Sequence, residues 1–208
     1  RNEVLIGWSK DGFHWNRENK KPFLPVSEDF HAWNAGNVQS TAGSPLIVGD
    51  SLYFYVSGRY NSKPKHDSNF ATGLAMLRRD GFVSMRAGRK EGYIEIKTQI
   101  PANGNYLFVN ADVKGTLAVE VLDDNGQPME GFTKKDCISM KKSDKTKQMI
   151  SWEKHPGVTS LVGKTVRLKF YLNQADIYAF WISAWQTGES GGYTGGGGPG
   201  LSDEGIDT

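Results

Sequence analysis

The stretch of residues 22–44, "PFLPVSEDFHAWNAGNVQSTAGS", gathers polar and aromatic side chains of the kinds that bind sugars. A pyranose ring stacks its apolar C–H face on an indole or phenol ring, and its hydroxyls pair with planar amides, carboxylates and guanidinium groups. The candidate substrate-binding residues in this stretch are Trp33, Asn34, Asn37 and Gln39. A structured loop whose polar groups satisfy only its own backbone is the alternative interpretation, and the sequence leaves both open.

Arg59 is a further candidate substrate-binding residue, because it stands at the end of an expected strand in "VSGRYNSKPKHDSNF". Its guanidinium group can clamp a sugar or a carboxylate, or it can form a salt bridge at a rim. His66 and Asp67 follow in a long polar loop, but one His-Asp pair is too few ligands for zinc, which takes three or four from the protein. We therefore expect no metal site and no cofactor.

Catalysis of glycoside hydrolysis needs two carboxyl groups that flank the scissile bond. Glu28 and Asp29 are weak candidates, because neighbouring residues of a strand point to opposite faces, so at most one of them can contribute. No phosphate-binding loop or nucleophile-elbow motif is found. Cys137 is the one cysteine, which excludes a disulfide within the chain and predicts a buried apolar side chain.

The elements that position these residues are expected to be strands throughout. The chain has no sustained helical periodicity, and short alternating runs bounded by Gly, Asn and Asp indicate an all-β fold. In "SPLIVGDSLYFYVSGR" two strands flank Gly49-Asp50, and both faces of the second strand are largely apolar or aromatic. This predicts a strand that is covered on both sides.

A repeat suggests how these strands are organised. Asp11-Gly12-Phe13 recurs as Asp80-Gly81-Phe82, with two expected strands between the copies. A four-stranded repeating unit is typical of propeller blades, whereas two copies of a tripeptide can also recur by chance. We expect residues 1–90 to form a β-propeller portion, with a half blade at 1–24 and a full blade at 36–88.

A blade and a half cannot close a ring, since propellers need about four to eight blades. The chain is therefore expected to be the C-terminal part of a longer protein. The missing N-terminal blades would lie on a removed segment or on a separate chain. On this interpretation the opening stretch "WSKDGFHWNR" is structural, with Trp8 and Trp15 packed against the neighbouring blade.

Residues 91–185 change character, because clean alternation of apolar and polar residues replaces the two-sided apolar pattern. About six to eight strands are expected, including "YIEIKTQI", "YLFVNADV", "TLAVEVL", "TVRLKFYL" and "DIYAFWIS". Asn125-Gly126 predicts a hairpin with a type I′ turn. The pattern favours a β-sandwich (jelly-roll-like) domain. Residues 186–208 form a Gly-rich tail, expected to be a flexible linker.

The composition restricts which classes of partner the chain is expected to bind. The formal charge of +2 comes from 25 basic and 23 acidic side chains, which gives no electrostatic case for nucleic acid. No apolar run approaches the roughly 18 residues of a membrane span. Carbohydrate remains the expected partner.

Several motifs, taken in order, resemble those of one enzyme group. "IGWSKDGFHWNR", "PFLP", "WNAGNVQS", "LYFYVSGR", "GLAMLRRDGF" and "YLFVNADVKGTLAVEVLDDNGQ" are similar to segments of bacterial glycosyl hydrolases with a five-bladed propeller, related to families 32 and 43. "SKDGFHW" also resembles the sialidase Asp-box, but it lacks one residue between Asp11 and Gly12. The resemblance spans residues 1 to about 183.

The resemblance implies a secreted, periplasmic or cell-surface bacterial protein that acts on oligo- or polysaccharides. It implies the last blade and a half of the propeller followed by a β-sandwich, with most catalytic carboxylates on the missing blades. Whether the chain belongs to an enzyme, a glycosidase, stays uncertain at this point. The alternative is a non-catalytic carbohydrate-binding or scaffold component of a surface complex.

Overall fold

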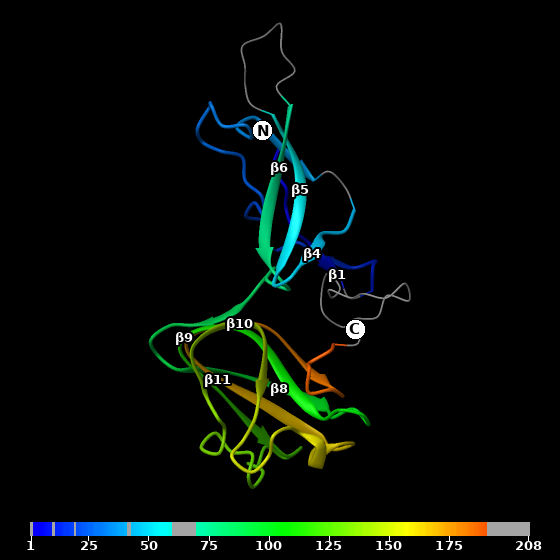
Figure 1. Ribbon diagram of the computed structural model, residues 1–208, viewed down its shortest axis with the longest axis vertical. Coiled ribbons are helices and arrows are strands. Elements are labelled where there is room, and N and C mark those ends of the chain that lie inside the picture. Colours follow the sequence, from blue (N-terminus) through cyan, green and yellow to red (C-terminus); the bar gives the residue numbers. More distant parts are fainter. Residues whose placement is uncertain (1, 10, 19, 41–42, 60–69, 191–208) are drawn as a thin grey trace, which may run out of the picture. The chain divides into compact units, whose positions relative to one another are not determined.

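The computed structural model describes residues 2–9, 11–18, 20–40, 43–59 and 70–190 (Figure 1). Within these residues the fold is all-β, as predicted, and the one helical element is a 3₁₀ turn at Thr159–Leu161. Predictions for His66, Asp67 and the Gly-rich tail from residue 191 lie outside the described residues. In the described part of the chain, no helix is long and apolar enough to cross a membrane.

Contacts divide the chain into two compact units. The first contains residues up to Leu46 together with Ser51–Met76, and the second contains Ile47–Asp50 and the residues from Leu77 onward. The sequence placed a domain boundary after residue 90, and that boundary, like the assignment of blades, stays a prediction. The units are described separately below.

The first unit holds a short ribbon and most of a larger sheet, of which residues 47–48 and 77–78 belong to the second unit. β1 (Trp8–Ser9) and β2 (Trp15–Asn16) form the antiparallel ribbon. In the larger sheet β5 is the central strand, which pairs with the other three. Its members are β3 (Asn37–Ser40), β4 (Leu46–Val48), β5 (Ser51–Arg59) and β6 (Phe70–Arg78).

One face of this sheet is packed and the other is open. Val38 and Val56 join Val26 in a small core, with Phe54 packed against them. The opposite side chains of β5 and β6 form what we call the outer sheet face. The most exposed members of that face are Tyr55, Phe70, Leu74 and Met76. The two-sided cover predicted for β5 is thus absent among the described residues.

The second unit is built on one antiparallel sheet (Figure 1). β9 pairs with one edge of β11, and β10 pairs with the other edge of β9. β8 and β7 pair with successive parts of β11. The five strands are β7 (Met85–Ala87), β8 (Gly92–Gln99), β9 (Tyr106–Leu122), β10 (Met140–Ile150) and β11 (Thr165–Ser183). The predicted alternation of β8 is confirmed, because its side chains are exposed and half-buried in turn.

The prediction of six to eight strands in this region is wrong, because two pairs of predicted strands are continuous. β9 and β11 each run through the point where the sequence suggested a break. The break is a bulge and not a turn. Lys114 and Gly115 of β9 face a single residue on each neighbouring strand, Lys142 on β10 and Gln174 on β11, whose φ values are 44° and 43°. A bulge bends a strand without ending it.

The predicted hairpin around Asn125-Gly126 forms, with Leu122 bridging to Pro128. Its turn is not type I′, which needs positive φ at both central residues. Only Gly126 has a positive φ, at 83°. The reason is that the Asp123 carboxylate accepts the N–H groups of Asn125 and Gln127, at 2.9 and 2.8 Å, and fixes a longer loop.

The core of the second unit is apolar and closely packed. Trp152, Phe170 and Leu168 are almost fully buried in it. Cys137 is buried there too, as predicted, and burial raises the pKa of its thiol. Such a thiol is held in its protonated, unreactive form at neutral pH.

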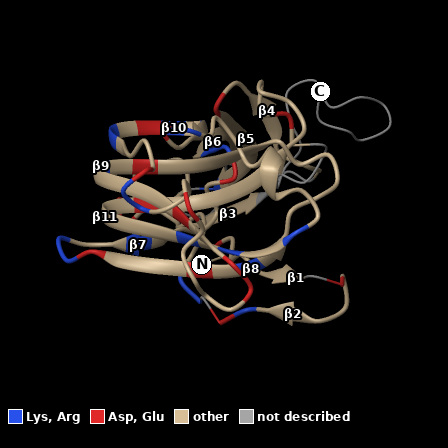
Figure 2. Cartoon of the chain, turned by 90° about the horizontal axis from the view of Figure 1, so that it is seen from below, with Lys and Arg blue, Asp and Glu red and all other residues tan. Residues whose placement is uncertain are grey.

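Charged side chains of the second unit are mixed in sign, as Figure 2 shows along β9 and β10. Arg86 pairs with Asp176 at 2.8 Å, and Arg167 pairs with Glu95 at 3.0 Å. Charges of both signs are therefore interspersed on the strands of this unit.

Asn110 is a buried polar residue in the first third of β9. It is 0% exposed, and its amide is used at both ends. Oδ1 accepts from Arg78 Nε and Nδ2 donates to the Arg79 carbonyl, both at 2.6 Å. Arg78 also donates to the Ala111 carbonyl at 3.2 Å. One amide therefore fixes Arg78, the last residue of β6, and the next residue, Arg79, onto β9.

We expect Asn110→Ala to lower the free energy of unfolding by roughly 2 kcal/mol, because it removes both hydrogen bonds of a fully buried amide, one from Arg78 and one to the Arg79 carbonyl. Urea denaturation followed by circular dichroism measures the loss. Asn103→Ala is the matched control, since Asn103 is exposed and its truncation should change the value by less than about 0.5 kcal/mol. Equal stability of the two variants would contradict the role given to Asn110.

Candidate functional site

The β1–β2 turn is fixed by its own side chains. The Asp11 carboxylate accepts the N–H groups of Phe13 and His14 at 2.9 and 2.8 Å, and the Ser9 hydroxyl accepts the N–H of Gly12 at 2.8 Å. Gly12 has a φ of 78°, a value that glycine adopts without strain. The Asp-Gly turn predicted from the sequence is confirmed, and Asp11 has a structural role within it.

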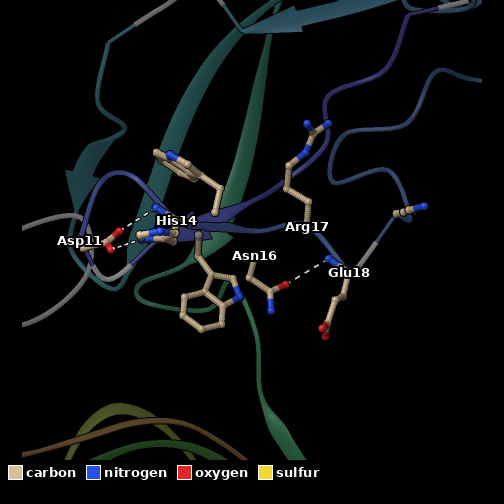
Figure 3. A pocket seen from close by; sticks show the side chains of 8 residues that line it. Asp11, His14, Asn16, Arg17 and Glu18 are labelled. Carbon is tan, nitrogen blue, oxygen red and sulfur yellow. Dashed lines mark hydrogen bonds and ion pairs between the residues drawn. The ribbon is translucent and has the colours of Figure 1, made fainter.

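Asp11 and His14 also point toward one another across the turn (Figure 3). Asp11 Oδ2 lies 2.5 Å from His14 Nδ1. The hydrogen bond with the His14 side chain, followed by those with the backbone N–H groups of His14 and Phe13, holds the pKa of Asp11 well below its usual range. Asp11 is therefore a carboxylate at all ordinary pH values.

A groove of about 750 Å³ lies beside this ribbon, and Asn16, Arg17 and Glu18 line it together with both tryptophans (Figure 3). Trp8 pairs with Asn16, whereas Trp15 pairs with Ser9. Because cross-strand partners share a face and successive residues alternate, the two indoles belong to opposite faces of the ribbon. They do not form one stacking surface, so the groove does not qualify as a sugar platform.

In the loop before β3, the predicted residues Asp29 and Asn34 hold the backbone. Asp29 Oδ1 accepts the N–H of His31 at 2.9 Å, and its own N–H donates to the Ser27 hydroxyl at 3.1 Å. Asn34 donates to the Pro25 carbonyl at 3.4 Å. Glu28 is exposed beside Asp29. For Asp29 and Asn34 these contacts favour the alternative of a loop that satisfies itself.

Trp33 occupies a slot made by two glycines of the sheet. A Cβ added at Gly58 would lie 2.3 Å from Trp33 Cε3, and one added at Gly73 would lie 2.3 Å from Cη2. The indole therefore rests directly on the backbone of β5 and β6. It lies on the packed face and is 37% exposed.

The other three predicted binding residues lie on the outer sheet face. Asn37 pairs with Arg59, and Gln39 pairs with Ser57, while Val38 between them faces the core. The sheet thus brings Asn37, Gln39 and Arg59 together and separates them from Trp33. The set predicted from the sequence is divided between two faces.

Aromatic residues complete this arrangement. The Arg59 guanidinium lies over the Phe70 ring, 4.3 Å from its centroid. Tyr55 shares the face of Arg59, four residues earlier on β5, and its side chain is 50% exposed. We call Asn37, Gln39, Tyr55, Arg59 and Phe70 the outer-face site. Sequence reasoning missed Tyr55 and Phe70, although the alternation along β5 was a signal for Tyr55.

Asn37 supplies the most informative atom of the outer-face site. Its Oδ1 is buried, and no described residue donates a hydrogen bond to it. An unsatisfied buried acceptor costs about 1–3 kcal/mol, so native proteins rarely keep one without a reason. A donor supplied from outside the described residues would satisfy it.

Comparison of the chain with protein-family models, curated proteins and solved structures found no match. Among the described residues no cluster of three or more His, Cys, Asp or Glu side chains is arranged to hold a metal ion.

We expect Gly58→Ala to destabilise the first unit, because the new methyl group would occupy the position of the Trp33 ring. Overpacking of this kind costs about 1–3 kcal/mol. Thermal unfolding measures the cost, and the near-ultraviolet circular dichroism of the tryptophans reports displacement of the ring. Gly88→Ala is the control, since no atom lies within 4 Å of its added Cβ. Unchanged stability and spectrum in Gly58→Ala would rule out the slot.

The pKa of Asp11 predicts how the β1–β2 turn responds to acid. A depressed carboxyl pKa stabilises the turn above the unfolded value of 3.8, and the contribution is lost as the pH falls through the folded value. The amide resonances of Phe13 and His14 should therefore stay constant down to pH 3.8 and shift only below it. In His14→Ala the transition should move toward 3.8. A wild-type midpoint at 3.8 would refute the interaction.

Proposed function

We propose that the chain binds carbohydrate through the outer-face site. The observation that carries the proposal is Asn37 Oδ1, a buried acceptor without a donor among the described residues. A sugar hydroxyl is a donor of the right kind and reaches this oxygen when the Asn37 side chain turns outward. Gln39 and Arg59 stand on the same face, where the carboxamide can donate or accept and the guanidinium donates to hydroxyl oxygens.

The aromatic residues of the site supply the second half of sugar recognition. Tyr55 and Phe70 are each at least half exposed, although large apolar side chains are usually buried. Their ring faces can stack on the C–H groups of a pyranose. Arg59 lies on Phe70 and is thereby held in one place before a ligand arrives, which lowers the entropy cost of binding.

The larger protein that we propose for this binding function is a bacterial glycoside hydrolase that works outside the cytoplasm. In it the first unit would be the last part of a propeller and the second unit a sandwich domain. The resemblance of the motifs in residues 1–183 to segments of such enzymes supports this idea. Most catalytic carboxylates would then lie on other blades, with Glu28 as a weak candidate here.

A glycan-binding measurement tests the proposal. We expect Asn37→Ala and Arg59→Ala each to weaken binding of a responsive oligosaccharide about tenfold or more by isothermal titration calorimetry. Asn37→Ala should not lower the melting temperature, because it removes an unsatisfied acceptor. This separates a binding role from a structural one.

Arg89→Ala is the matched control, an exposed arginine outside the site whose loss should leave binding unchanged. If both site variants bind every glycan of a broad panel as the parent does, the outer-face site is not the binding site. An assay for released reducing ends on the same panel distinguishes a glycoside hydrolase from a non-catalytic carbohydrate-binding component. Release of reducing ends favours the hydrolase, and binding without release favours the non-catalytic component.

A further inference from the structure

A second crevice lies in the second unit, where the end of β8 and the end of β11 approach each other. Its volume is about 510 Å³, within the range of small-molecule sites. We call it the end crevice. Its principal lining residues are Gln99, Asn103, Phe180, Ile182, Trp185 and Glu189.

One wall of the end crevice is the turn that follows β11, and buried hydrogen bonds hold it. Ser183 is 2% exposed. Its hydroxyl donates to the Glu189 carbonyl at 2.7 Å and accepts the N–H of Trp185 at 3.0 Å. Trp181 Nε1 donates to the Gly188 carbonyl at 3.0 Å, while its ring stacks on Phe108 with centroids 5.6 Å apart. The turn is fixed before any ligand binds.

The opposite wall is the tight turn between β8 and β9. Gly104 N–H donates to the Pro101 carbonyl at 2.8 Å, and a Cβ at Gly104 would lie 2.8 Å from Ile182 Cγ2. Asn105 links the two walls, because its Nδ2 donates to the Ala184 carbonyl at 2.9 Å. Asn103 stands on this turn and is exposed at the crevice.

The lining of the end crevice combines an aromatic ring with planar polar groups. Trp185 is 52% exposed, an unusual state for an indole held on a rigid turn. Gln99 and Asn103 offer carboxamides, and Gln99 is fixed by a hydrogen bond of 3.1 Å to the Gly163 carbonyl. Among the described residues of the lining, Glu189 is the one that is charged, and none is Lys or Arg. The charge disfavours anions.

We propose that the end crevice is a second saccharide-binding site and that it takes neutral saccharides in preference to acidic ones. Trp185 would stack on a pyranose face, while Asn103, Gln99 and Glu189 receive its hydroxyls. The proposal is independent of the outer-face site, because the residues of that site belong to the first unit.

The test uses the full chain labelled with 5-fluorotryptophan and read by ¹⁹F NMR. The Trp185 resonance is assigned by its loss in Trp185→Phe. We expect cellotetraose, xylotetraose or mannotetraose to shift it in a saturable way, and trigalacturonic acid to require at least tenfold higher concentration. Asn103→Ala should weaken the effective neutral ligand about tenfold, and Glu189→Gln should reduce the discrimination against trigalacturonic acid.

Two controls separate this proposal from the outer-face site. Asn37→Ala should leave the titration of Trp185 unchanged, and the Trp8 resonance should not respond. A Trp185 resonance that no neutral tetrasaccharide moves would overturn the proposal, whatever calorimetry shows for the first unit. An unchanged dissociation constant in Asn103→Ala would also overturn it, and equal affinity for trigalacturonic acid would overturn the assigned selectivity.

Discussion

The pairing of β9 with β11 is the interaction on which the second unit depends. Both strands are longer than usual, and they stay hydrogen-bonded from Arg167–Leu122 at one end to Ser183–Tyr106 at the other. Their register is interrupted near Gln174 and again near Tyr178, so the two strands bend together. A sheet that bends and remains paired can curve around a core without exposing unpaired backbone between two sheets.

The same curvature explains where polar groups are found. Asn110 lies at the second interruption, where the ladder shifts by a residue, and its amide oxygen accepts a hydrogen bond from Arg78 there. At the far end of β11 the curved sheet ends in two short turns, and the end crevice is the space between them. In the first unit the polar residues are placed differently. Gly58 and Gly73 on neighbouring strands leave space for the Trp33 indole on one face of the sheet, and the polar residues lie on the opposite face.

The sequence predicted the all-β character of the fold, the alternation of β8 and the burial of Cys137, because each depends on a local pattern. It did not predict the continuity of β9 and β11. A bulge at Gln174 and a turn between strands share the same polar residues, and only long-range pairing distinguishes them. For the candidate site, the residue types indicated which side chains could bind a sugar, but the sequence did not show which face of the sheet each one lies on. Trp33 was grouped with Asn37 by proximity along the chain, whereas the register of β3 on β5 separates them.

The glycine slot under Trp33 also bears on how this protein can change over evolutionary time. The indole fills the volume that side chains at Gly58 and Gly73 would need, so no one of the three positions can vary freely. A larger residue at either glycine becomes tolerable only after the tryptophan has been replaced by a small residue. In an alignment of homologues these three positions should therefore co-vary. A large residue at position 33 should occur with glycine at 58 and 73, and a small residue at 33 should occur with larger residues at 58 or 73. Such a pattern would identify the sheet even where overall similarity has been lost.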